Sequence, residues 1–229
     1  ADETAEWSPD IGIFKGFALG MKGWFMRYAQ EVERDVRTGA RQDYTEAREW
    51  LQRGVELLKP FDDQCEWALV NVLEVFFNGR WNESESWDLV EKCRDVFQTH
   101  GDHWGEALAV VCLGCWNFAV DRNAALKYQK EALTIRQNAD DAWGLGESYS
   151  AVGTCLYRLE RFQEARDYYK KSLDIFTVLD QNPNGKSRSL FNLGIACAAL
   201  EQLEEAVKWF KQALELSESM NNLYRTAVL

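Results

Sequence analysis

The chain has 229 residues, of which 46% are hydrophobic and 28% charged, a globular balance that excludes a disordered tail. Asp and Glu outnumber Lys and Arg by 37 to 26, and the net charge of −11 argues against a nucleic-acid-binding surface, which needs basic stripes. With two histidines there is little room for histidine-dependent catalysis, and the acidic, polar N-terminus is not expected to be a signal peptide.

Apolar residues recur at intervals of three and four along most of the chain, which is the spacing of amphipathic helices. No segment alternates for long enough to indicate a strand, and Pro60 and Pro183 fall between the helical patterns. The fold class is therefore predicted to be all-α. We expect helices over residues 12–37, 43–59, 64–78, 83–99, 103–118, 122–138, 142–159, 162–179, 186–200 and 203–219.

The first predicted helix carries Gly12, Gly16 and Gly20 on one face, which predicts close approach of another helix. The same stretch is apolar, but lysines and four glycines interrupt it, so no membrane span is expected.

An internal repeat with a period near 40 residues organises the chain. An apolar residue followed by glycine recurs at 113–114, 152–153 and 193–194, and pairs of small residues seven apart follow at 125 and 132, 165 and 172, and 206 and 213. Weaker pairs lie at 47 and 54 and at 86 and 93. We predict a single domain over 1–229, with an atypical first repeat at 1–60, repeats at 61–100, 101–139, 140–181 and 182–220, and the start of a truncated repeat at 221–229. Both ends are expected to be boundaries within a longer protein.

These motifs resemble the tetratricopeptide repeat, whose pattern is matched by Leu193, Gly194, Ala206, Phe210 and Ala213 and again by Gly153, Ala165 and Tyr169. The resemblance implies a right-handed superhelical solenoid of antiparallel helix pairs, here with about five repeats of 39–41 residues. The period is longer than the usual 34 residues of that family, Glu74 replaces a repeat glycine, and Ser86 replaces a repeat alanine.

Three features make the family resemblance more specific: the long period, the links GDHWG and DDAWG, and the segment LGMKGWFMRYA from Leu19. They resemble the C-terminal sensor arrays of bacterial STAND proteins (signal transduction ATPases with numerous domains), relatives of the maltose-regulon activator. That resemblance implies that the array senses a ligand and that a nucleotide-switch domain, missing from this chain, lies upstream.

Two segments suggest chemistry but are better interpreted as structural. Residues 180–187 end in Gly-Lys-Ser, yet Asp180 stands where a phosphate-binding loop needs its first glycine, and a helix precedes it instead of a strand. His100, His103, Cys112 and Cys115 are good zinc ligands, but the cysteines lie along a helix that carries them away from the histidines. We predict no metal, no cofactor and no catalytic residues, and we interpret all six cysteines as reduced core thiols.

The first helix of each unit lines the concave face of such a solenoid, which is its default binding surface. Counting from the glycine marker of each unit places the following residues on that face: Trp24, Asn71, Val75, Phe118, Glu147, Thr154, Tyr157, Arg158, Arg188 and Asn192. Arg158 and Arg188 suit a carboxylate, and the apolar residues suit a protein or peptide segment or a small molecule.

These features predict a non-catalytic, cytoplasmic recognition module with no nucleic-acid or membrane partner. The leading hypothesis is the sensor region of a bacterial STAND ATPase, in which ligand binding on the concave face relieves autoinhibition. The alternative is a free-standing adaptor or co-chaperone that binds peptide segments.

Overall fold

The computed structural model of the chain describes residues 9–32, 44–78, 84–118, 120–179 and 182–227. Within these ranges every regular element is a helix, which confirms the predicted all-α helical-repeat fold. None of the described helices combines the length and the apolar character that crossing a bilayer requires. The contacts of the chain divide it into two compact units, residues 1–112 and 113–229, so each unit is described by itself.

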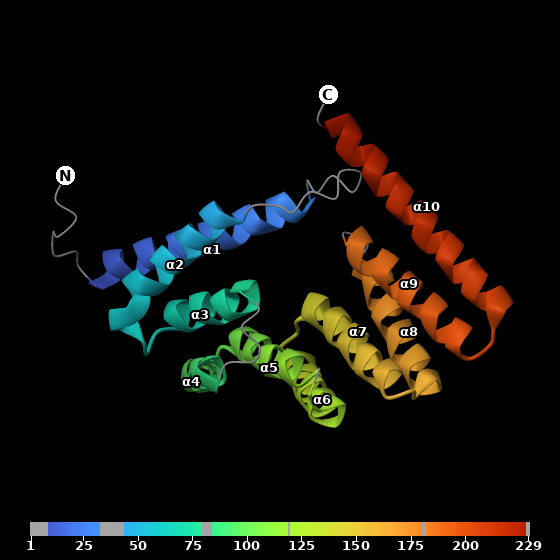
Figure 1. Cartoon of the computed structure of the whole chain (residues 1–229), viewed down its shortest axis with the longest axis horizontal. Helices are drawn as coiled ribbons and strands as arrows, with labels where there is room; N and C mark the ends of the chain where they lie inside the picture. The colour runs from blue at the N-terminus through green and yellow to red at the C-terminus, as the bar shows by residue number, and fades with distance from the viewer. Residues whose placement is uncertain (1–8, 33–43, 79–83, 119, 180–181, 228–229) are drawn as a thin grey trace. The chain divides into compact units, whose positions relative to one another are not determined.

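The first unit contains two helical hairpins and the start of a fifth α-helix (Figure 1). Its elements are α1 (Pro9–Val32), α2 (Thr45–Leu58), the short 3₁₀ helix η1 (Lys59–Phe61), α3 (Cys65–Asn78), α4 (Ser84–His100) and the first part of α5 (His103–Asn117). α1 pairs with α2, α3 pairs with α4, and α3 also packs against both α1 and α2.

The second unit begins within α5 and continues through five further helices (Figure 1). They are α6 (Arg122–Asn138), α7 (Ala142–Arg158), α8 (Phe162–Leu179), α9 (Pro183–Ala199) and α10 (Leu203–Ala227). The hairpins α7/α8 and α9/α10 stack on each other, because α9 packs against both α7 and α8.

Most helices lie within three residues of the expected bounds, and α6 and α8 coincide with them. The main difference is α10, which runs on to Ala227 instead of ending at 219. Residues 221–227, expected to begin a new repeat, therefore belong to α10. No glycine or proline stands between residues 203 and 229, so nothing in the local sequence ends the helix.

In three hairpins a glycine of the first helix lies against the second helix. A Cβ atom added to Gly153 of α7 would lie 2.7 Å from the Tyr169 ring, and one added to Gly194 of α9 would lie 2.5 Å from the Phe210 ring. In the first hairpin, Gly23 of α1 faces Ala47 and Leu51 of α2 in the same way. Gly23, Gly153 and Gly194 therefore occupy one equivalent position of the repeat.

The glycine row of α1 also packs as predicted. A Cβ added to Gly16 would lie 2.7 Å from the Leu58 side chain, and one added to Gly54 of α2 would lie 2.6 Å from the Cα of Gly20. The prediction of close helix packing at this row is thus confirmed.

A second glycine position lies at the start of each first helix. A large side chain of the preceding second helix covers it in three successive units: Phe97 beside Gly105, Arg136 beside Gly144, and Phe176 beside Gly185. The N-terminal turn is fixed by a carboxylate or amide that accepts a hydrogen bond from the same glycine nitrogen, namely Asp102, Asp141 and Asn182, at 2.8–2.9 Å. The packing of one hairpin on the next therefore needs a large residue on one side and glycine on the other.

Arg136 replaces the phenylalanine of the other units with a buried cation. Its Nη1 donates to the Gly144 carbonyl at 2.8 Å and to the Ser148 hydroxyl at 2.9 Å, and its Nε lies 3.7 Å from an Asp141 carboxylate oxygen. Burial lowers the pKa of this guanidinium, and the nearby Asp141 opposes that shift. The pairing with Asp141 and the two hydrogen bonds offset the cost of burying the charge.

Phe176 is fully buried between Gly146 and Gly185. We expect Phe176→Ala to lower the free energy of unfolding by about 3–5 kcal/mol, because it removes the ring that fills the junction between two hairpins. Val178 on the same helix is 85% exposed, so Val178→Ala is the matched control and should change stability by less than about 0.5 kcal/mol. Urea denaturation of both variants measures the difference, and equal stabilities would contradict this account of the junction.

Candidate functional site

A polar strip crosses from α7 to α9 on the first-helix side of the second unit. Arg188 of α9 forms an ion pair with Glu147 of α7, and the Asn192 amide of α9 donates to the Ser150 hydroxyl of α7 at 3.2 Å. Both links join residues about one repeat apart. The structure therefore brings three of the predicted ligand-binding residues, Glu147, Arg188 and Asn192, onto one surface.

Thr154 continues this line along α7 and is half-buried. Its hydroxyl donates to the Ser150 carbonyl at 3.0 Å and accepts from the Tyr169 hydroxyl at 3.3 Å. Thr154 is thus held by its own helix and by α8.

Arg158 lies at the C-terminal end of α7 beside Phe118, which directly follows α5. Its guanidinium carbon is 5.7 Å from the centre of the Phe118 ring, within the range of a cation–π interaction. Tyr157 turns toward α8, where its ring centre lies 5.2 Å from that of Phe162. Phe118 and Tyr157 both pack on the core of the second unit, whereas Arg158 is exposed.

Two of the predicted residues are buried and do not lie on a surface. Asn71 and Val75 of α3 are buried, with 4% and 1% exposure, and the Asn71 amide donates to the Trp67 carbonyl of its own helix at 2.8 Å. A ligand does not reach them, because they fill the interior of the first unit. Trp24 belongs to α1, but its side chain lies outside the described residues.

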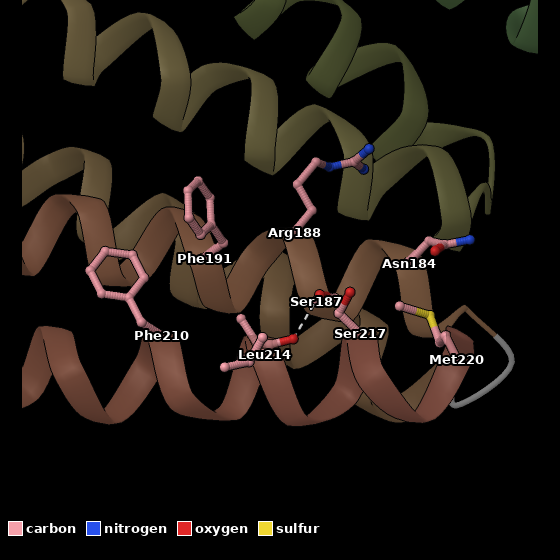
Figure 2. Close-up of a pocket in the computed structure, with 9 residues that line it drawn as sticks. Asn184, Ser187, Arg188, Phe191, Phe210, Leu214, Ser217 and Met220 are labelled. Atoms are coloured by element: carbon pink, nitrogen blue, oxygen red, sulfur yellow. Dashed lines mark hydrogen bonds between the residues drawn. The ribbon is translucent and has the colours of Figure 1, made fainter. Parts of the chain in front are cut away.

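A pocket of about 640 Å³ opens between α9 and α10, beside the polar strip. Figure 2 shows Arg188, Phe191 and Asn184 on α9 across from Phe210, Leu214, Ser217 and Met220 on α10. The Ser187 hydroxyl donates to the Ala213 carbonyl at 3.3 Å across its floor. Of the lining residues, only Arg188 belongs to the predicted ligand-binding set.

The lining is apolar, and much of it is in contact with solvent. Phe191 is 51% exposed and Leu214 is 58% exposed, and the Phe191 and Phe210 ring centres are 5.5 Å apart. Aromatic side chains exposed to this extent around a hollow indicate an interaction surface more than a catalytic centre.

The α10 part of this pocket escaped prediction, because only first helices were expected to bind. One signal was available in the repeat itself. Ser217 occupies the position held by Phe97, Arg136 and Phe176 in the preceding units, and the exchange of a large residue for serine leaves the hollow.

The cysteines show why thiol chemistry does not define this site. All six are free, and Cys93, Cys112, Cys155 and Cys197 are buried. Burial raises the pKa of Cys155 to about 12, which keeps it protonated and unreactive at neutral pH. Cys115 is exposed, so the expectation that every cysteine is a core residue is wrong at this position, where the side chain points away from the packed face of α5.

The two segments that suggested chemistry have structural roles here. The ring Nε2 of His100 lies 2.8 Å from the Asp63 carbonyl oxygen, and among the described residues no group of three or more His, Cys, Asp or Glu side chains is placed to hold a metal. Asn182 caps α9, and Gly185 is buried against Phe176 instead of lining a phosphate-binding loop.

Comparisons with known proteins agree with this architecture. The family model for the tetratricopeptide repeat matches residues 121–177 and 144–219, so this part of the chain carries tetratricopeptide repeats. A comparison with curated proteins finds no match.

Several crystal structures share the fold. One is a Rap protein complexed with competence and sporulation factor, with a TM-score of 0.73 and 15% identity; the match covers 97% of this chain and 59% of the Rap chain. The apo form of RapI gives 0.69 and 13%, covering 93% of this chain and 73% of that one. A STAND protein with a tetratricopeptide repeat sensor from Pyrococcus horikoshii gives 0.65 and 16%, covering 90% and 31%. At these identities the likeness shows the fold.

The Glu147–Arg188 ion pair is exposed, with 48% of the Arg188 side chain accessible to solvent. Such pairs contribute about 0–1 kcal/mol, so we expect Arg188→Ala to lower the free energy of unfolding by less than about 1 kcal/mol. The matched control is Arg136→Ala, which removes a buried arginine and should cost about 3–5 kcal/mol. Urea denaturation of both variants measures the two costs. A large loss for Arg188→Ala would show that this residue supports the fold and is not free to serve a ligand.

Proposed function

We propose that this chain is a non-catalytic recognition module that binds a protein or peptide segment on the first-helix surface of its second unit. The observation that carries the proposal is the polar strip from α7 to α9, where Glu147, Arg188 and Asn192 present charged and amide groups beside the exposed ring of Phe191. Tetratricopeptide repeats in this part of the chain support a protein-binding role.

The chemistry of the strip favours an extended segment with a carboxylate next to an apolar side chain. Arg188 pairs with Glu147 at the surface, where exchange for a ligand carboxylate has a small free-energy cost. Arg158 supplies a second cation farther along α7, and Thr154 lies between the two. A small molecule with an acidic and an aromatic part would use the same groups.

We further propose that the module is the sensor region of a bacterial STAND-type ATPase and works in the cytoplasm. The similarity to a STAND protein with a tetratricopeptide repeat sensor supports this proposal, and six free cysteines suit a reducing compartment. Ligand binding would relieve autoinhibition of a nucleotide-switch domain elsewhere in the protein. This works as a population shift, which requires that the ligand binds the active state more tightly than the inactive one.

An adaptor or co-chaperone that binds peptide segments without a switch is the second candidate. The same strip and pocket serve it, and the similar Rap structure, complexed with competence and sporulation factor, is compatible with a repeat array that binds its partner directly.

The ligand surface can be tested with peptides selected from a random peptide library against the purified chain. Because a hydrogen bond to a charged group contributes about 1.5–3 kcal/mol, Arg158→Ala and Arg188→Ala should each weaken binding roughly tenfold to a hundredfold in calorimetric titration. Arg161 is also exposed and paired, with Glu164, so Arg161→Ala is the matched control and should leave affinity unchanged. Equal affinities for all three variants would place the ligand elsewhere.

The switch and the adaptor differ in what accompanies the module. Reading the gene upstream of Ala1 should reveal a phosphate-binding loop within roughly 300–400 residues if the module is a STAND sensor. The purified full-length protein should then retain or hydrolyse ATP and change its oligomeric state when the selected peptide is added. Binding of the peptide with neither response would support the adaptor.

A further inference from the structure

The face of each first helix that packs on the preceding hairpin is defined by equivalent residues. In α9 these are Gly185, which lies on Phe176, Ser189, whose hydroxyl is 2.9 Å from that of Ser172, and Asn192, which donates to Ser150. We call this the leading face. The surface of the preceding hairpin that accepts it is the receiving surface.

The pocket between α9 and α10 is the receiving surface of the α9/α10 hairpin. Aligning Gly194 with Gly153 pairs Ser187 with Gly146, Ala213 with Ser172, and Ser217 with Phe176. These are the positions that seat α9 one repeat earlier. Both hairpins also have a hydrogen bond between these positions, with donor and acceptor helices exchanged. Ser172 of the second helix donates to the Gly146 carbonyl, whereas Ser187 of the first helix donates to the Ala213 carbonyl.

The leading face of α1 is exposed and apolar. Aligning Gly23 with Gly194 places Phe14, Ala18 and Met21 at the positions of Gly185, Ser189 and Asn192. Phe14 is 74% exposed and Ala18 is exposed as well. Ile11 and Phe25 extend the same stripe, with 47% and 61% exposure. The spacing of 3, 4, 3 and 4 residues is that of a helix face that packs on other helices.

The two surfaces are complementary in size at the position that controls stacking. Within the chain, a large residue of the receiving surface lies against glycine on the leading face, as Phe176 does against Gly185. On the α9/α10 hairpin the large residue is replaced by Ser217, and on α1 the glycine is replaced by Phe14. Phe14 would therefore fill the hollow that Ser217 leaves.

The neighbouring positions agree. Ser189 of α9 and Ser172 of α8 are in contact, and the equivalent residues of α1 and α10 are Ala18 and Ala213. The polar pair Ser150 and Asn192 corresponds to the apolar pair Phe191 and Met21. Each change keeps the two sides matched in polarity, which is what a buried contact requires.

We propose that α1 of a second copy of this chain occupies the pocket between α9 and α10, so that copies associate head to tail. Phe14 enters the hollow above Ser217, and Phe17, at the position of Arg188 in α9, lies near the guanidinium of Arg188. The contact is heterologous, because it joins two different surfaces, and repeated contacts of this kind build rings or open arrays. This association does not require the proposed ligand, although Arg188 and Phe191 border both surfaces.

Sedimentation velocity of the 229-residue chain between roughly 1 μM and 1 mM tests the proposal, because weak association is populated in that range. The weight-average mass of wild type should rise with concentration above the 26.5 kDa of one chain. Phe14→Asp removes the anchor and Ser217→Phe fills the hollow, so each variant alone should stay at the mass of one chain. A wild-type chain that stays monomeric throughout overturns the proposal.

Mixing the two variants gives the sharper test. The Phe14→Asp chain keeps an intact pocket, and the Ser217→Phe chain keeps an intact α1, so an equimolar mixture should form a single heterodimer and nothing larger. No other arrangement of the two surfaces predicts association only in the mixture. Two monomers in the mixture would refute the head-to-tail contact.

Control variants distinguish this contact from nonspecific association and from misfolding. Val178→Asp changes an exposed apolar residue outside both surfaces and should associate like wild type. Circular dichroism and thermal unfolding should show that each variant is folded. If Ser217→Phe does not fold, Phe191→Asp takes its place, because Phe191 is half exposed at the pocket rim. Should the Val178→Asp chain also become monomeric, the association would not depend on the proposed surfaces.

Discussion

The stacking of the α7/α8 and α9/α10 hairpins depends on matched side-chain sizes at two repeat positions. Inside a hairpin, a glycine such as Gly153 allows the first helix to approach the second, and between hairpins a glycine such as Gly185 lies against a large residue such as Phe176. Helix spacing follows from these contacts, because interiors are packed without room for an added methyl group. The positions of Glu147, Arg188 and Asn192 on one surface are a consequence, since stacking α9 on α7 brings residues about one repeat apart into contact.

Much of the fold could be predicted from sequence because the signals are periodic. The helices over 122–138 and 162–179 are found where the apolar spacing places them, and the row Gly12, Gly16 and Gly20 packs as its spacing indicates. Periodicity does not show whether a residue on a given helix face is exposed to a ligand or buried against a neighbouring helix. The count from the repeat glycine marker predicts Asn71 on the ligand surface, but its amide donates to the Trp67 carbonyl within α3 and the residue is buried. A polar side chain can be buried as well as exposed, since a carbonyl of its own helix can accept its hydrogen bond.

Only the part of the candidate site that lies on first helices could be predicted from the repeat spacing. Counting from a repeat glycine identifies which residues share a face of α7 or α9, and this was sufficient for Glu147 and Arg188. It does not show that those two side chains pair with each other, which lowers the free charge that either offers a ligand. The pocket residues of α10 lay outside that count, because the second helix of a repeat is normally covered by the next unit. The sequence does carry one signal for the pocket, because Ser217 stands at the repeat position that Phe97, Arg136 and Phe176 occupy in the preceding units.

The α9/α10 pocket and the exposed face of α1 bear on how ligand binding and self-association, as proposed, would affect each other. Arg188 and Phe191 border both the polar strip and the α9/α10 pocket, so a ligand on the strip and a helix in the pocket compete for or share the same side chains. If they share them, binding at one surface changes affinity at the other, and the coupling is reciprocal by thermodynamic necessity. A ligand that draws Arg188 away from Glu147 would alter the rim that the incoming helix contacts. Recognition and assembly would then be linked through one residue at the surface, with no rearrangement of the buried packing on which the fold depends.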